Sequence, residues 1–270
     1  MTGTTELTVR IGAALEPLDV AGDEQPATAL RALVAAHPHE RVELTVRDPS
    51  AAIEQVAHAA GFEPVYRHVS VRGSLAAVRL PSPRPLTFRR WEEVGRRGVL
   101  ALLDALWRGR PGPTGLPAAG ELERFLDLAR GRDGAPDTSL WRVAYRAGEP
   151  AGLSLGLALD ERSGALLYLG LLEGLRGQRL GAALHAEALW LMRSRGLVRY
   201  QDGTAEDNLP MRRIFARAGC EPRGTVVLLV RPAPGGGEPA PKPAVRRLPL
   251  GAHVSLLRKV PWGGGVHGFA

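Results

Sequence analysis

Two proline-rich segments divide the 270-residue chain and limit which parts of it fold together. The segment Pro81–Pro85 predicts an extended linker, because proline fixes φ and biases each preceding residue away from the helical region. A longer stretch of proline and glycine begins at Arg231. We therefore expect a first folded part at 1–80, the linker at 81–85, a second folded part at 86–230 and a loosely ordered basic tail at 231–270.

The composition is that of a globular protein with a real core. Apolar residues make up 44% and charged residues 23%, and the length suits one and a half to two domains. The single cysteine, Cys220, excludes an intramolecular disulfide and a cysteine-rich metal site, so we expect a reducing compartment and no metal. No apolar run reaches the roughly 18 residues of a spanning helix, and the first residues lack the order of a signal peptide. This predicts a cytoplasmic protein without a membrane partner.

The positive charge is concentrated in the tail. The formal net charge is +7, and residues 231–270 hold six basic residues against Glu238 alone, which leaves a surplus of two for the rest of the chain. Lys and Arg neutralise phosphates, so such a charge is typical of nucleic-acid-binding proteins. Because the excess of basic residues lies in the tail, we do not expect the folded part to recognise a specific nucleic acid. Nucleic-acid binding remains an alternative hypothesis, which predicts salt-sensitive binding that is lost when 231–270 are deleted.

Hydrophobic periodicity in the second part predicts a mixed α/β domain. Apolar residues recur at helical spacing in some segments and in short, partly alternating runs in others, with turn signals between them. The predicted order is two helices, three antiparallel strands, a helix, a strand, a helix and a strand, at Val94–Trp107, Gly120–Ala129, Leu140–Tyr145, Gly152–Leu159, Ala165–Leu172, Gly181–Arg195, Leu197–Asp202, Leu209–Ala218 and Gly224–Val230.

The segment from Leu169 to Leu184 carries the most specific signal for a binding site: a strand, a short glycine-containing turn and a helix. Such a turn aims unpaired backbone N–H groups and the positive end of a helix dipole at one point, which suits a pyrophosphate. Small residues in the first turn of the helix, Gly181, Ala182 and Ala183, let a ligand approach the backbone. A tight connection without any ligand shows the same pattern, and both interpretations stay open at this point.

This turn resembles the acyl-CoA pyrophosphate loop of the GNAT superfamily, whose pattern is Arg or Gln, two residues, Gly, one residue, then Gly or Ala. Arg176 and Gly181 match the outer positions, but the inner glycine is Arg179. We expect a helical backbone with negative φ at Arg179, whose guanidinium adds a charge-assisted contact to the phosphates. The resemblance implies acetyl-CoA as co-substrate, with contacts from Leu171, Leu172, Arg176, Gly177, Gln178, Arg179, Leu180, Gly181 and Ala182.

A second stretch, from Thr204 to Pro222, resembles the later motif of the same family, in which an Asn opens a helix beside the pantetheine arm. The resemblance implies that Asn208, Met211 and Phe215 also contact the cofactor. Asn is a strong N-cap residue, so helix capping explains Asn208 equally well. Many family members have a tyrosine seven residues after this Asn that protonates the departing thiolate, and here that position is Phe215.

Over about Leu86–Val230 the order of the elements is also that of the family. The resemblance therefore implies an α/β (α+β) GNAT fold with a mixed central sheet whose strands splay apart at the cofactor. A shift of 158 residues superposes Ala60–Pro64 on Ala218–Pro222, which indicates an internal repeat. The first part thus resembles the carboxyl-terminal half of a second GNAT fold without a cofactor loop, in a tandem arrangement like that of mycothiol synthase.

The implied reaction is transfer of an acetyl group to a primary amine that attacks the thioester directly. Main-chain N–H groups near Leu171 and Leu172 are expected to orient the pantetheine and polarise the carbonyl. The amine must first lose a proton, and the candidate bases are Glu173, after one strand, and Asp202, at the end of the next. Tyr168 is the candidate donor to the leaving thiolate. Each of these three residues also has an ordinary structural explanation.

We expect His185 to be a surface or packed histidine, and Cys220 to be a buried apolar thiol. Arg179 and Phe215 also fit a domain that binds acyl-CoA without turnover, as a sensor or partner-binding module. The expected acceptor is a small-molecule or peptide amine, and the expected state is a monomer or homodimer.

Overall fold

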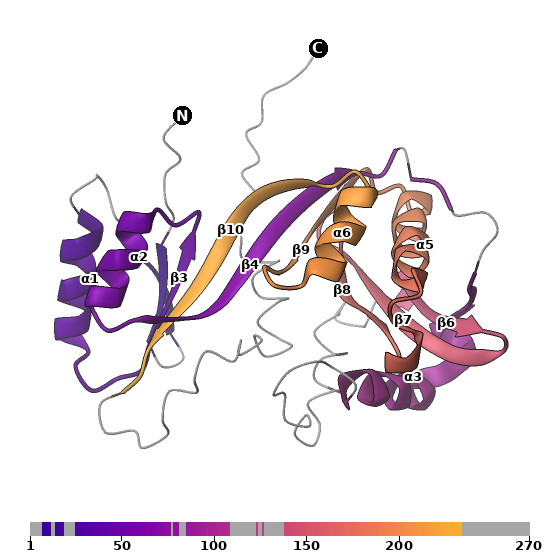
Figure 1. The fold of residues 1–270 in the computed structure, drawn as a ribbon, viewed down its shortest axis with the longest axis horizontal. Coiled ribbons are helices and arrows are strands. Elements are labelled where there is room, and N and C mark those ends of the chain that lie inside the picture. The colour runs from indigo at the N-terminus through magenta and orange to yellow at the C-terminus, as the bar shows by residue number, and fades with distance from the viewer. Residues whose placement is uncertain are drawn as a thin grey trace, which may run out of the picture. The chain divides into compact units, whose positions relative to one another are not determined.

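The structure, a computed structural model, describes the chain at residues 7–11, 14–18, 25–76, 78–80, 85–108, 123, 126 and 138–233. Its elements form two compact units, each assembled from separate stretches of sequence (Figure 1). Unit 1 comprises the described residues of 1–71, 203–212 and 222–247, and unit 2 those of 72–202 and 213–221. Residues 81–84 of the predicted linker and residues 234–270 of the predicted tail lie outside the described residues.

Unit 1 is a sheet with two helices packed on it, and its pairs β1–β2, β1–β3 and β3–β10 are antiparallel. Its strands follow the order β2-β1-β3-β10-β4. The elements are β1 (Leu7–Ile11), β2 (Ala14–Leu18), α1 (Gln25–Ala36), β3 (Val42–Arg47), α2 (Ala51–Ala59), β4 (Glu63–Ser74) and β10 (Glu221–Arg231). The residues of β3 alternate between buried and half-buried, as expected of a strand with one face in the core. Val42, Leu44 and Val46 form that face and share a core with residues of both helices.

The strand that completes unit 1 comes from the far end of the described chain. β10 lies between β3 and β4, and it pairs with β3 in antiparallel register from Val226 opposite Arg47 to Arg231 opposite Val42. The compact units therefore differ in their boundaries from the predicted parts 1–80 and 86–230. The predicted division concerns how the sequence is organised, and it stays a prediction.

Unit 2 is a mixed sheet with helices on it, in agreement with the predicted α/β class. Its strands follow the order β5-β6-β7-β8-β9, and all neighbours are antiparallel except β8 and β9. The elements are β5 (Thr87–Arg90), α3 (Trp91–Arg108), η1 (Thr138–Leu140), β6 (Trp141–Arg146), β7 (Glu149–Ala158), β8 (Ser163–Leu171), η2 (Glu173–Leu175), α5 (Leu180–Ser194), β9 (Arg199–Ala205) and α6 (Leu209–Arg217).

Most predicted elements of the second part are confirmed to within a few residues at their ends. The predicted helix Gly120–Ala129 is described only at Glu123 and Leu126, both of which are helical. No strand is predicted at the positions of β1, β2, β4 and β5. β5 is four residues long and contains two arginines, so it shows no hydrophobic alternation. Among the described helices, none combines the length and apolarity needed to cross a membrane.

Candidate active site

The parallel strands β8 and β9 pair only at their first residues. Within these two fully described strands, the Cα partners are Ser163 with Arg199 and Gly164 with Tyr200. Beyond them, the Leu166 N–H donates to the Asp202 carboxylate over 3.1 Å, so a side chain of β9 replaces a backbone partner. The strands therefore part after Gly164, which agrees with the splayed strands that the family resemblance implies.

A bulge in β8 determines which of its backbone N–H groups face the region where β8 and β9 separate. The register with β7 shifts between Leu155 and Gly156, which leaves Leu167 as an extra residue in β8. The Leu172 N–H donates to the Ala151 carbonyl of β7 over 3.0 Å. Because successive residues of a strand direct their N–H groups to opposite edges, the Leu171 N–H faces away from β7.

The structure thus separates two residues that the sequence analysis treats together. The Leu171 amide lies on the edge of β8 that faces the parting, whereas the Leu172 amide is used within the sheet. On the same edge, the Leu171 carbonyl accepts a hydrogen bond of 3.1 Å from the Arg176 Nε. This bond ties the turn that follows β8 to the end of the strand.

The turn between β8 and α5 has the backbone of an anion site. Gly177 has φ +76°, and Arg179, the residue before α5, has φ 61° and ψ 6° without any side-chain capping bond. The first N–H groups of a helix have no intrahelical acceptor, so those of Leu180, Gly181 and Ala182 point out of the amino end of α5. The positive end of the helix dipole lies at the same place.

The predicted negative φ at Arg179 is wrong. The residue adopts the left-handed conformation that glycine takes most easily, which costs a residue with a Cβ roughly 1 kcal/mol. Arg179, at the position of the family's inner glycine, therefore has a backbone conformation that suits glycine.

Three exposed arginines lie on or beside this turn. Arg176 and Arg179 come from the turn itself, and Arg146 comes from the end of β6. The Arg146 guanidinium donates to Gln178 Oε1, while Gln178 Nε2 donates to the Gly174 carbonyl over 3.0 Å. Arg146 is not among the predicted site residues, because it lies 32 residues before Gln178 and only the sheet brings the two together.

Gly181 has a packing role in addition to the predicted one. A Cβ added there would lie 3.1 Å from Ile214 Cδ1 of α6 and 3.9 Å from Leu171 Cδ1 of β8. The missing side chain therefore lets α5 pack closely on its neighbours. A bulky substitution at Gly181 disturbs this packing as well as any bound ligand, so the charged residues of the turn are better probes of binding.

The three predicted catalytic residues lie in different surroundings. Glu173 is exposed on η2. Tyr168 is half-buried opposite Leu155 in the register, on the face of β8 away from Leu169 and Leu171, which pack with α5. Asp202 is only 3% exposed.

Asp202 accepts the hydrogen bonds of a buried polar cluster. Its Oδ2 accepts from the Leu166 N–H and from the Tyr200 hydroxyl. His185 Nε2 lies 3.1 Å from the same hydroxyl, and since Tyr200 gives its proton to Asp202, the imidazole is the donor. Burial lowers the pKa of His185 from 6.5 to about 4, with Asp202 opposing the shift, so the ring is neutral at pH 7. His185 is thus a packed histidine.

Two buried residues, Phe215 and Cys220, lie near this cluster. Phe215 is buried, and its ring centre lies 5.7 Å from that of His185 and 6.2 Å from that of Tyr200. Cys220 is buried as expected, and burial followed by the Asp202 charge raises its thiol pKa to about 12. A thiol with that pKa is protonated and is a poor nucleophile at neutral pH.

Asn208 caps the amino end of helix α6. Its Oδ1 accepts from the Met211 N–H over 3.3 Å, and its Nδ2 donates to Thr204 Oγ1 over 2.8 Å. The capping interpretation of Asn208 is therefore confirmed. Contacts of Asn208, Met211 and Phe215 with a cofactor stay predictions.

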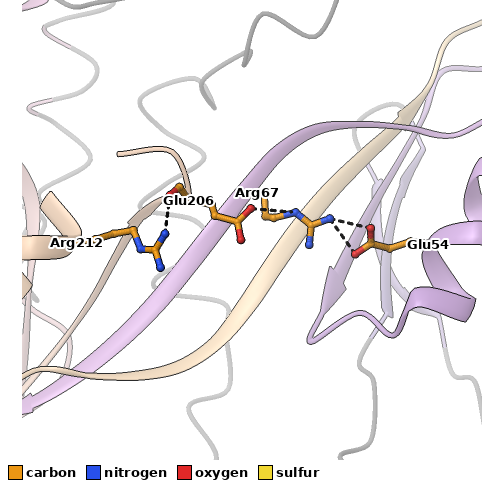
Figure 2. A network of polar contacts seen from close by, with 4 residues as sticks. All are labelled: Glu54, Arg67, Glu206 and Arg212. Atoms are coloured by element: carbon orange, nitrogen blue, oxygen red, sulfur yellow. Dashed lines mark hydrogen bonds and ion pairs between the residues drawn. The ribbon is translucent and has the colours of Figure 1, made fainter. Parts of the chain in front are cut away.

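A polar network holds the turn that leads to Asn208. Figure 2 shows the Arg67 guanidinium between the two carboxylates of Glu54 and Glu206, at 2.8 Å and 3.4 Å. Arg212 donates to the Glu206 carbonyl over 3.0 Å, and the Glu206 N–H donates to the Arg67 carbonyl over the same distance. The hydrogen bond with Glu54 is the main reason that the pKa of Arg67 is raised.

Comparison with known proteins shows which family and which solved structures this chain is similar to. Residues 100–220 match the acetyltransferase (GNAT) family. No curated protein matches the chain. This family match includes the whole turn between β8 and α5, together with Asn208, Met211 and Phe215.

Several solved structures share the fold. A GCN5-related N-acetyltransferase from Sphaerobacter thermophilus is 21% identical with a TM-score of 0.55, over 76% of this chain and 65% of that one, so the chain spans just under two thirds of its length. A GCN5-related N-acetyltransferase from Kribbella flavida is 20% identical, with a TM-score of 0.51 over 82% of this chain and 80% of that one. A tandem GNAT protein from the clavulanic acid biosynthesis pathway is 18% identical, with a TM-score of 0.52 over 84% and 82%.

Proposed function

The chain carries a domain of the acetyltransferase (GNAT) family, and from this premise we propose that it transfers an acetyl group from acetyl-CoA to a primary amine. The observation that carries the proposal is the uncapped amino end of α5, where a left-handed Arg179 exposes the first amides of the helix. A diphosphate supplies the acceptors and the negative charge that these amides, the helix dipole and the neighbouring arginines attract.

In this proposal the acyl end of the co-substrate lies where β8 and β9 part. The Leu171 N–H donates to the pantetheine or to the thioester carbonyl, where it stabilises the negative charge that develops on the oxygen. Arg146, Arg176 and Arg179 hold the diphosphate. Gly177 and Ala182 leave the backbone accessible beside it.

The chemistry is a direct displacement. The acceptor nitrogen attacks the thioester carbonyl carbon, the carbon–sulfur bond breaks, and the thiolate takes up a proton. A primary amine with a pKa of about 10 is protonated at neutral pH, so a base must first remove one proton. We assign this step to the exposed Glu173, because the carboxylate of Asp202 is already hydrogen-bonded within the buried cluster. Tyr168 is the assigned donor to the thiolate.

We also propose that the amino-terminal part is a degenerate copy of the segment from β9 to β10. In support, Ser50 Oγ accepts from the Ile53 N–H over 3.3 Å, as Asn208 Oδ1 does from the Met211 N–H at positions 158 residues later. The Asp48 N–H likewise donates to the Thr225 carbonyl over 2.7 Å, and the pair displaced by 158 residues is Glu206 with Arg67. This copy contributes a structural framework to unit 1.

A second candidate function is acyl-CoA binding without turnover. It is favoured by Phe215, which places an apolar ring where many family members have a tyrosine that protonates the thiolate. Both candidates require acetyl-CoA to bind at the same turn. They differ in whether free CoA is released in the presence of an amine.

The test combines calorimetric titration of the full chain with acetyl-CoA and a screen for CoA release over amines, aminoglycosides and peptide amino termini. We expect saturable binding that weakens about tenfold or more in Arg179→Glu, because charge-assisted contacts to the phosphates are lost and replaced by repulsion. Arg162→Glu is the matched control, since Arg162 is an exposed arginine in the turn before β8, at the other end of that strand.

The outcomes separate the hypotheses. Binding together with CoA release supports the transferase, and binding without release for any amine supports the silent binder. Equal acetyl-CoA affinities of Arg179→Glu and Arg162→Glu would contradict the assignment of the turn and remove the basis of both.

A further inference from the structure

A second group of arginines lines a cavity of about 420 Å³ in unit 2. The cavity is bounded by Arg90 at the end of β5, by Arg142 of β6 and by the last turn of α5 with Trp190 and Arg195. α5 has 15 residues, so this end lies about 22 Å along the helix from the diphosphate turn. The two groups of arginines therefore belong to different sites.

Two of these arginines are held side by side. Arg90 and Arg142 are Cα partners in the antiparallel pair of β5 and β6, so their side chains leave the sheet on the same face as neighbours. The Arg142 Nη1 donates to the carbonyls of Ser139 and Trp141 over 3.2 Å and 2.7 Å. These bonds fix the guanidinium in place beside another positive charge.

The surroundings of Arg142 disfavour its charged form. Burial is the main cause that lowers the pKa of Arg142; the Glu187 charge opposes this shift, the Arg90 charge adds to it, and the Glu92 and Glu93 charges oppose it further. An anion between the two guanidinium groups would relieve this repulsion. Arginine pairs are well suited to that task, because each presents parallel N–H donors to carboxylate or phosphate oxygens.

Two of the acidic residues near the cavity have hydrogen-bond partners of their own. Glu92 accepts from Thr138 Oγ1 over 3.0 Å, and Glu93 accepts from the Arg90 backbone N–H over 3.1 Å. Among the described residues, no carboxylate lies within 4 Å of the charged nitrogens of Arg90, Arg142 or Arg195. The lining thus holds three positive charges and the single negative charge of Glu92.

The remaining wall is apolar. Trp190 is 38% exposed, which is high for a tryptophan, and Leu191 lines the cavity next to it. A volume of this size suits a small molecule rather than a single inorganic ion. A ligand with a flat or aliphatic body covers Trp190 while its charged group reaches the arginines.

We propose that this cavity is a binding site for a small organic anion, a carboxylate or a phosphate monoester, whose charged group lies between Arg90 and Arg142 and whose body rests on Trp190. The site is separate from the acetyl-CoA site and does not depend on the proposed transfer reaction.

The test uses the full chain with benzoate and phenyl phosphate as probes and benzyl alcohol as the neutral counterpart. Binding is followed by calorimetry and by the tryptophan fluorescence that Trp190→Phe removes. We expect saturable binding of at least one of the two anions and no binding of benzyl alcohol. Arg90→Gln and Arg195→Gln should each weaken it, Arg90→Gln by about tenfold, since a charge-assisted pair of hydrogen bonds is lost. Arg162→Gln, outside the cavity, should leave the affinity unchanged.

Arg142→Gln tests the central residue, and Arg90→Gln keeps the proposal testable if that variant unfolds. The proposal is overturned if neither anion binds, if Arg90→Gln binds as tightly as the wild type, or if saturating acetyl-CoA displaces benzoate. It is also overturned if tetraglutamate binds through Arg90 more tightly than either probe, because the cavity would then be part of a surface for acidic peptides.

Discussion

Burial of His185 predicts a pH dependence of stability with a definite sign. The pKa of this imidazole is about 4 in the folded protein, first because burial penalises the charged ring, and about 6.5 in the unfolded chain. Between these values the unfolded state binds one more proton than the folded state. Stability is therefore full above about pH 6.5 and falls by about 1.4 kcal/mol per pH unit below it, to a loss of about 3 kcal/mol near pH 4.

The variant that isolates this contribution is His185→Gln. Glutamine keeps an N–H donor for the Tyr200 hydroxyl and does not titrate, so its loss of ring packing is the same at every pH. The free energy of unfolding is measured by urea titration at about pH 7.5 and about pH 4.5 for both proteins. We expect the wild type to lose about 2.5 kcal/mol more than His185→Gln over this interval. An equal loss in the two proteins would refute the argument.

Three further predictions concern the turn, the buried cluster and the polar network. Arg179→Gly should leave the free energy of unfolding within about 1 kcal/mol of the wild type, because relief of the left-handed strain offsets the added chain entropy, while acetyl-CoA affinity falls through loss of the charge. Asp202→Ala should lower the free energy of unfolding by on the order of 3 kcal/mol, since the Leu166 N–H and the Tyr200 hydroxyl lose their acceptor, and Asp202→Asn should cost less in the same urea titration. Arg67→Ala should cost about 1 kcal/mol at low salt and less in 0.5 M NaCl, because its two ion pairs are partly exposed and screened by salt.

Local patterns in the sequence predict the elements of the fold, and long-range pairing is what they miss. The periodic segments of α5 and α6 and the glycine-containing turn at Gly177 carry their signals within a few residues, and the structure confirms them. The insertion of β10 between β3 and β4 has no local signal, because strand pairing depends on residues far apart in the chain.

For the candidate site too, short motifs predict some features, while others depend on contacts between residues far apart in the chain. The turn and the cap at Asn208 are visible in short motifs, whereas Arg146 joins the turn only through the sheet. The left-handed backbone at Arg179 is missed because an arginine there gives no hint of a conformation that favours glycine. The burial of Asp202 depends on how β8 and β9 part, which the sequence of β9 does not reveal.

The place of β10 in unit 1 has a consequence for biosynthesis. β3 emerges from the ribosome long before its partner, because Arg47 pairs with Val226, about 180 residues later, and at 5–20 residues per second that is a delay of roughly 10–40 seconds. During this time one edge of β3 lacks its native neighbour and is open to pairing with other nascent chains. Slow translation or a truncated message should therefore direct this protein toward aggregation, and co-expression with a holdase chaperone should raise its yield.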